Sequence, residues 1–116
     1  MNEKRSITQK DSEQYEMLQP LLYASYKEIQ ELSKKKPDTP LNALKVKMIN
    51  RILVPLKEIL SGEDVAEYID LLSEDELPTN SDAVLILSQY LRALDAYKMK
   101  YYKHNSRTGR SEWIIK

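Results

Sequence analysis

Four carboxylates in the middle of the chain are spaced so that they could hold a metal ion. Their separations of four, three and four residues place them on one face of a helix, and the set comprises Glu63, Glu67, Asp70 and Glu74. Mg²⁺ requires such oxygen ligands, and Glu13 and Glu16 form a further carboxylate pair. A metal-dependent hydrolase is therefore a remote hypothesis, because 51 positions separate Glu16 from Glu67. A solvated acidic face and a docking surface for a basic partner are the commoner interpretations.

The C-terminal part of the chain interleaves cations with tyrosines. The cations are Lys98, Lys100, Lys103, Arg107 and Arg110. Positive charge that follows a phosphate backbone, beside rings that stack on bases, is typical of a nucleic-acid-binding surface. Cations at a helix C-terminus are also favoured by the helix dipole alone. Because the chain has zero net charge and an isoelectric point near 6.6, nucleic-acid binding is the alternative hypothesis and not the first one.

The most unusual feature is an apolar cluster close to the last residue. Trp113, the only tryptophan, is followed by Ile114 and Ile115 and flanked by Arg110 and Lys116. Such a cluster either folds back onto the rest of the chain or inserts into a partner. A tryptophan beside cations has the composition that interface hot spots favour, so we interpret these three residues as a partner anchor.

Several chemistries are excluded by composition. The chain has no Cys, which rules out a thiol nucleophile, a disulfide framework and a Cys-ligated metal. Two glycines, Gly62 and Gly109, cannot form a Gly-rich phosphate loop. A single histidine, His104, has no evident nucleophile to assist. We therefore expect no catalytic set, no bound metal and no cofactor.

The zero net charge conceals a segregation of charge along the chain. Residues 27–57 sum to +5, residues 58–82 to −9, and residues 92–116 to +5. Acids near helix starts and bases near helix ends explain part of this pattern through the helix dipole. The remainder favours partners of opposite charge, which such blocks would steer.

Apolar spacing predicts the elements that must position these residues. A first helix is expected from about Ser12 to Lys34–Lys36, and Pro20 either kinks it or opens the main helix at its first turn. A second is expected from Pro40 to about Leu60, capped by Thr39. A short helix is expected over 63–73, and a long last one from about 81 to 103, with Thr79, Asn80 and Ser81 as candidate caps. The fold class is all-α: a small helical bundle of three long helices and one short one. Residues 1–11 read as a flexible lead-in, 12–103 as the bundle, and 104–116 as a tail, turn-like and then possibly extended.

The first functional hypothesis is a small non-enzymatic protein that acts by binding another protein, as an accessory subunit, adaptor or inhibitor. Trp113, Ile114 and Ile115 would anchor the partner, and Glu63, Glu67, Asp70 and Glu74 would dock it electrostatically. The wide apolar faces of the second and last long helices also suggest a homo-oligomer. The longest apolar run, Ala83–Leu87, is far shorter than the roughly 20 residues of a membrane span. We therefore expect a soluble, cytoplasmic protein with no membrane partner.

Overall fold

The computed structural model describes residues 7–115, and about 68% of these residues are helical. The long elements are α1 (Gln9–Lys35), α2 (Ala43–Ile59) and α3 (Asn80–Tyr101). Two short 3₁₀ turns, η1 (Leu60–Gly62) and η2 (Asp64–Tyr68), follow α2, and a hairpin of β1 (Tyr102–Asn105) and β2 (Arg110–Trp113) follows α3. The prediction of a mostly helical chain is confirmed, and the small antiparallel sheet is an addition to it.

The first helix begins earlier than its apolar spacing predicts. Thr8 caps it: its hydroxyl accepts a hydrogen bond from the Asp11 amide at 3.1 Å, and the Asp11 carboxylate accepts one from the Thr8 amide at 3.2 Å. Ile7, just before the cap, is only 1% exposed. Residues 1–6 of the expected lead-in lie outside the described residues, and residues 9–11 belong to α1. The polar residues at the start of α1 form a reciprocal capping box, which apolar spacing alone does not indicate. Pro20 lies inside α1 and does not end it.

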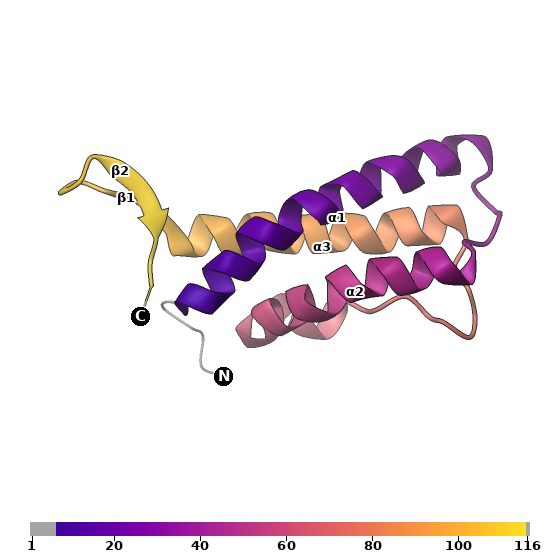
Figure 1. Ribbon diagram of the computed structural model, residues 1–116, viewed down its shortest axis with the longest axis horizontal. Coiled ribbons are helices and arrows are strands. Elements are labelled where there is room, and N and C mark those ends of the chain that lie inside the picture. The colour runs from indigo at the N-terminus through magenta and orange to yellow at the C-terminus, as the bar shows by residue number, and fades with distance from the viewer. Residues whose placement is uncertain (1–6, 116) are drawn as a thin grey trace.

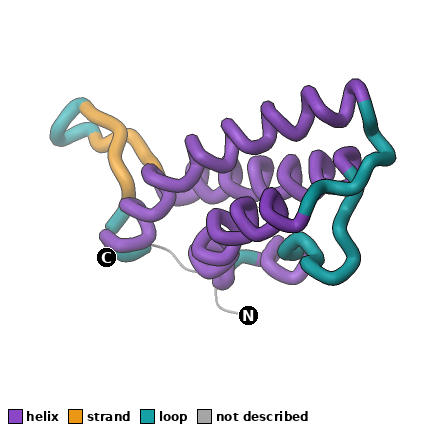
Figure 2. Tube along the Cα trace, turned by 45° about the vertical axis from the view of Figure 1, so that its right-hand side comes forward, coloured by secondary structure: helices purple, strands orange, loops and turns teal. Residues whose placement is uncertain are grey.

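The second helix begins at Ala43, with Asn42 as its cap, and not at Pro40. Thr39 fails as a cap because the chain around it is held by the segment before α3. Pro40 and Thr79 form an antiparallel bridge, the Leu41 amide donates to the Pro78 carbonyl at 2.8 Å, and the Asn80 amide donates to the Thr39 carbonyl at 2.9 Å. These bonds join the two loops at one end of the molecule (Figures 1 and 2).

The helices form an elongated body, 51 Å by 30 Å by 18 Å, in which α1 packs against both α2 and α3 (Figure 1). The chain reverses direction between α1 and α2, and it runs back along the bundle before α3 begins. Both α2 and α3 therefore run antiparallel to α1. Their inward-facing side chains form one core. Its largest fully buried members include Tyr90, Tyr97, Tyr101, Leu22 and Leu53.

The predicted short helix over 63–73 is present only as the 3₁₀ helix η2, which ends at Tyr68. After η2 the chain forms neither helix nor strand from Ile69 to Pro78, with a bend at residues 74–76. Side chains of α2 form hydrogen bonds with backbone groups that a helix would use for its own hydrogen bonds. The buried side-chain amide of Asn50 donates to the Leu72 carbonyl and accepts from the Leu72 backbone N–H, both at 2.9 Å. The Lys57 ammonium donates to the Ile69 carbonyl at 2.7 Å. Ile69 and Leu72 are three residues apart, a spacing typical of a helix, but both side chains are buried from a segment that is not helical.

The expected tail is a hairpin that projects beyond the end of the bundle (Figure 1). α3 begins after its cap Thr79, as the cap residues predict, but it ends at Tyr101 and not at Lys103. β1 pairs antiparallel with β2, with Tyr102 opposite Trp113 and His104 opposite Ser111. Gly109 closes the turn at φ 73°, a conformation that side chains with a Cβ disfavour. The chain then returns to the bundle, where Ile115 pairs with Ile7 in a parallel bridge.

Candidate partner-binding site

The four carboxylates of the predicted acidic stripe do not share a helix face, because η2 ends at Tyr68 and two of the four lie beyond it. Glu63 is largely buried: its carboxylate accepts from the Tyr101 hydroxyl at 2.8 Å and pairs with the Lys100 ammonium at 3.1 Å. Glu67, Asp70 and Glu74 are exposed on the segment that follows. Glu63 therefore helps to hold η2 to α3, and only the other three are free to face a partner.

Metal binding was the remote use of these carboxylates. Within residues 7–115, no group of three or more His, Cys, Asp or Glu side chains is gathered closely enough to hold an ion. Glu13 and Glu16 lie on the first half of α1, whereas Glu67 lies in η2, so these carboxylates belong to different elements.

The apolar tail residues fold back onto the bundle, the alternative that the sequence left open. The Trp113 ring centre lies 4.9 Å from that of Tyr15 on α1 and 5.1 Å from that of Tyr102 on β1. The Ile114 amide donates to the Tyr101 carbonyl at 2.7 Å, and its carbonyl accepts from the Ile7 amide at 3.1 Å. Trp113 is half-buried, whereas the Ile114 and Ile115 side chains remain exposed.

The five predicted nucleic-acid-binding cations are distributed over α3 and the hairpin. Lys103 and Arg110 lie at diagonal positions on one face of the hairpin, and Arg107 lies in its turn. The Lys98 ammonium lies 4.9 Å from the centre of the Tyr102 ring. Lys100 is engaged with Glu63. The structure thus brings Lys103, Arg107 and Arg110 together on the projecting hairpin. Lys100 instead forms an ion pair with Glu63 within the molecule.

The fold-back of the hairpin creates a shallow groove of about 750 Å³ against the first half of α1. Trp113, Tyr102, Met17 and Ile115 supply its apolar surface. Among the described residues that line it there are three carboxylates and no Lys or Arg; the carboxylates are Glu13, Glu16 and Glu112. The Glu13 carboxylate accepts a hydrogen bond from the side-chain amide of Gln9 at 3.1 Å, and the Glu112 carboxylate accepts one from the side-chain amide of Asn105. We refer to this site, defined by these residues, as the aromatic groove.

Sequence reasoning identified Trp113 and Ile115 but did not connect them with Glu13 and Glu16. These two pairs are about a hundred positions apart. The available signal was Ile7, a lone apolar residue in a polar segment, whose burial beside Ile115 brings the two ends of the described chain together.

A cluster of buried tyrosines lies beneath the aromatic groove. Tyr97 stacks at 6.0 Å from Tyr15 and meets Tyr101 edge-on at 4.9 Å. Burial, followed by the charges of Asp95 and Glu16, raises the pKa of Tyr15 to about 12. Burial also raises the pKa of Tyr97, assisted by the charges of Asp11 and Glu63. These hydroxyls therefore stay protonated at neutral pH, and the negative charge at this end of the molecule belongs to the carboxylates.

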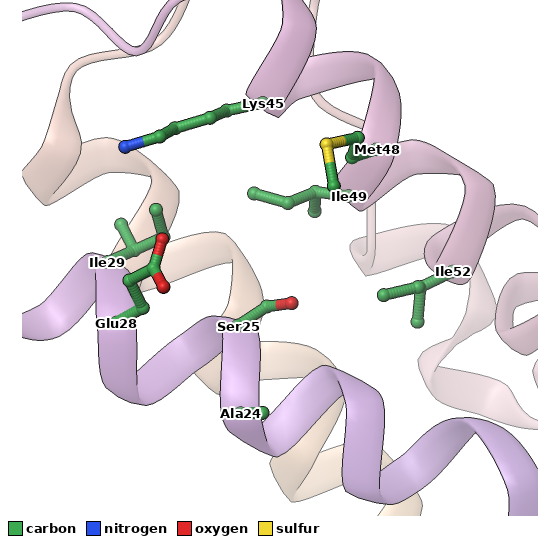
Figure 3. A pocket seen from close by; sticks show the side chains of 8 residues that line it. All are labelled: Ala24, Ser25, Glu28, Ile29, Lys45, Met48, Ile49 and Ile52. Carbon is green, nitrogen blue, oxygen red and sulfur yellow. The ribbon is translucent and has the colours of Figure 1, made fainter.

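A second depression, of about 250 Å³, lies between α1 and α2 (Figure 3). Ala24, Ser25 and Ile29 form one wall, and Met48, Ile49 and Ile52 form the other. Glu28 on α1 and Lys45 on α2 stand at the same end of it (Figure 3). We refer to this feature as the helix groove.

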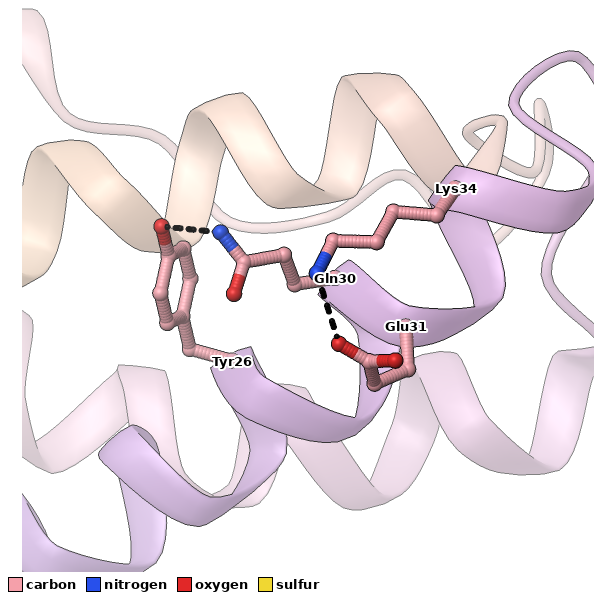
Figure 4. Close-up of polar contacts among 4 residues, drawn as sticks. All are labelled: Tyr26, Gln30, Glu31 and Lys34. Carbon is pink, nitrogen blue, oxygen red and sulfur yellow. Dashed lines mark hydrogen bonds and ion pairs between the residues drawn. The ribbon is translucent and has the colours of Figure 1, made fainter.

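The second half of α1 satisfies several of its polar groups locally (Figure 4). The Gln30 amide nitrogen donates to the Tyr26 hydroxyl at 3.1 Å, and Lys34 pairs with Glu31 at 2.9 Å. The Lys34 hydrogen bond and charge, with smaller contributions from Lys27 and Lys35, lower the pKa of Glu31. Such an exposed pair contributes little to stability, and it leaves no uncompensated charge at this position.

Comparison with protein-family models, curated protein sequences and solved structures gave no match to this chain. None of the helices in residues 7–115 has both the length and the apolar character that a membrane crossing requires. The function must therefore be argued from the surfaces described above.

Proposed function

We propose that this chain is a non-enzymatic protein that acts by binding another protein, as an accessory subunit, adaptor or inhibitor. The partner segment we propose is basic, with an apolar side chain beside its Lys or Arg, and it lies in the aromatic groove. One observation carries the proposal: Trp113 and Tyr102 are only half-buried and form an apolar surface that is edged by carboxylates.

The chemistry of the aromatic groove supports a cationic partner. Aromatic faces attract cations, and the approach of the Lys98 ammonium to the Tyr102 ring is an example within this chain. Glu13 and Glu16 are exposed and lie one turn apart on α1. They would bring negative charge to a Lys or Arg side chain resting on the rings, at a site where water is partly displaced.

This proposal modifies the roles first assigned to the tail and to the acidic segment. Trp113 would form the floor that receives the partner instead of inserting into it, and Ile115 would border the same floor. Glu67, Asp70 and Glu74 remain exposed. We propose that they accelerate encounter with a basic partner over a longer range, without contributing to the bound contacts.

A random peptide library, selected on the immobilised protein, tests this proposal without knowledge of the natural partner. We expect enriched sequences in which Lys or Arg neighbours a Leu, Met or aromatic residue. The double variant Glu13→Lys/Glu16→Lys should lose this enrichment, whereas Glu76→Lys, a charge reversal in an exposed loop, should retain it. No enrichment, or the same enrichment on all three proteins, would contradict the proposal.

Nucleic-acid binding is a second candidate because the hairpin places Lys103, Arg107 and Arg110 together at the projecting end of the molecule. If these cations contact phosphates, affinity for a single-stranded oligonucleotide should fall steeply with salt. The triple variant Lys103→Gln/Arg107→Gln/Arg110→Gln should reduce both the affinity and the salt dependence. Binding that is independent of salt, or unchanged in the variant, would exclude this candidate.

A further inference from the structure

An exposed apolar face extends the helix groove over both of its walls. Leu21 on α1 is 50% exposed and Met48 on α2 is 55% exposed. Leu21 precedes Ala24 and Ser25 by about one turn, so it continues the α1 wall, and Met17 lies one turn earlier on the same stripe. Ile52 lies one turn beyond Met48 on the α2 wall.

We propose that a second copy of this chain docks on this face, with its helices antiparallel to those of the first copy. A two-fold axis would pass near Ala24 and Ile52, close to the middle of α1 and α2. Each copy would then present the same apolar stripe to the other, as an isologous interface requires.

The distribution of charge favours this antiparallel arrangement. At the end near the α1–α2 connection, residues 24–35 and 43–50 carry a formal charge of +3; the contributing side chains are Lys27, Lys34, Lys35, Lys45, Lys47, Glu28 and Glu31. At the opposite end, residues 9–23 and 51–68 carry −3 when Glu63, which is paired with Lys100 of α3, is left out; the contributing side chains are Lys10, Arg51, Lys57, Asp11, Glu13, Glu16, Glu58, Asp64 and Glu67. A two-fold axis across the middle of the helices places the basic half of the α1–α2 face of each copy against the acidic half of the same face of the other. Parallel stacking of two copies would instead oppose like charges.

The dimensions of the face predict a weak association. α2 has 17 residues and is about 25 Å long, and two packed helices are about 20 Å wide. The footprint is therefore about 500 Å² on each copy, which is at the small end of specific protein interfaces. We infer a dimer that dissociates on dilution, in contrast to an obligate one.

Sedimentation equilibrium over a concentration series tests this inference. We expect reversible dimerisation of the wild type and a dissociation constant at least about tenfold higher in Met48→Lys and Leu21→Lys, because each would bury an unpaired charge. Leu85→Lys is the matched control, since Leu85 is 59% exposed on α3 and should leave the constant unchanged. Added salt should also weaken the dimer, because its ends attract through opposite charges. A monomer at every concentration, or equal effects of all three variants, would overturn the proposal.

A cross-linking experiment tests the position of the axis. The chain has no Cys, so Ala24→Cys introduces a single exposed thiol where the axis should pass. Mild oxidation should join two copies of Ala24→Cys efficiently and should not join two copies of Leu85→Cys. Equal yields, or none for Ala24→Cys in a protein that still dimerises, would show that the copies associate through another face or with another orientation.

Discussion

Two tyrosines in the core differ in one respect that should reverse the effect of the same substitution. Tyr97 and Tyr101 lie one turn apart on α3, and both are buried. The Tyr101 hydroxyl donates to the Glu63 carboxylate at 2.8 Å. The Tyr97 hydroxyl has no hydrogen-bond partner among the described residues. Phenylalanine keeps the ring and its contacts with Tyr15 and Trp113, so each Tyr→Phe change isolates the hydroxyl.

The expected free-energy changes follow from these environments. Loss of a hydrogen bond to a charged acceptor costs about 1.5–3 kcal/mol, and an unsatisfied buried hydroxyl costs about 1–3 kcal/mol. Tyr101→Phe should therefore lower the free energy of unfolding by about 2 kcal/mol, and Tyr97→Phe should raise it by about 1 kcal/mol. At about 4 °C of Tm for each kcal/mol, the two variants should differ by about 12 °C.

Urea unfolding followed by circular dichroism, together with thermal melts, measures both values. Equal slopes against urea in the three proteins would show that the variants unfold to the same extent. The reasoning would be refuted if Tyr97→Phe lost as much stability as Tyr101→Phe, because the Tyr97 hydroxyl would then have a stabilising partner.

Three further predictions concern the segments that sequence analysis misjudged and the titration of the core. Asn50→Ala should lower the free energy of unfolding by about 2–4 kcal/mol in urea titrations, because it leaves both backbone groups of Leu72 buried without a partner; an effect below about 1 kcal/mol would contradict the assigned role. Thr8→Ala should cost about 1 kcal/mol by loss of the α1 cap, whereas Thr8→Ser should restore most of it. Burial, chiefly, raises the pKa values of Tyr15 and Tyr90 to about 12, so the stability they contribute should be complete below about pH 10 and decline between about pH 10 and 12, by about 1.4 kcal/mol for each group at pH 11; urea titrations that show no such decline would contradict these shifts.

The sequence predicted the long helices well because they depend on local patterns. Apolar spacing located α1, α2 and α3, and Thr79 was among the cap residues named for α3. The errors occur where distant groups decide the conformation. Asn50 and Lys57 bind the backbone of residues 66–72, and the bridge between Pro40 and Thr79 displaces the start of α2. Such long-range hydrogen bonds leave no trace in the periodicity of the segments that they hold.

The candidate site was accessible to sequence reasoning only in part. Trp113 was distinctive as the only tryptophan, and its position predicted either of the two outcomes considered. What places it beside Glu13 and Glu16 is the hairpin and the pairing of Ile7 with Ile115, neither of which follows from local spacing. Glu63 shows the converse case, because an apparent member of a charged surface is bound by Lys100 and Tyr101 from α3.

The indole N–H resonance of Trp113 gives the most direct test of the proposed function, because the chain has a single tryptophan and therefore a single indole signal. The ¹⁵N-labelled protein would be titrated with a short peptide of alternating Lys and Leu, and separately with a matched peptide of Glu and Leu. We predict a saturable shift of the indole resonance with the basic peptide, no comparable shift with the acidic one, and loss of the response in Glu13→Lys/Glu16→Lys. An indole resonance that stays in place with the basic peptide, or that moves equally with both, would contradict the assignment of the aromatic groove as a site for a basic protein segment.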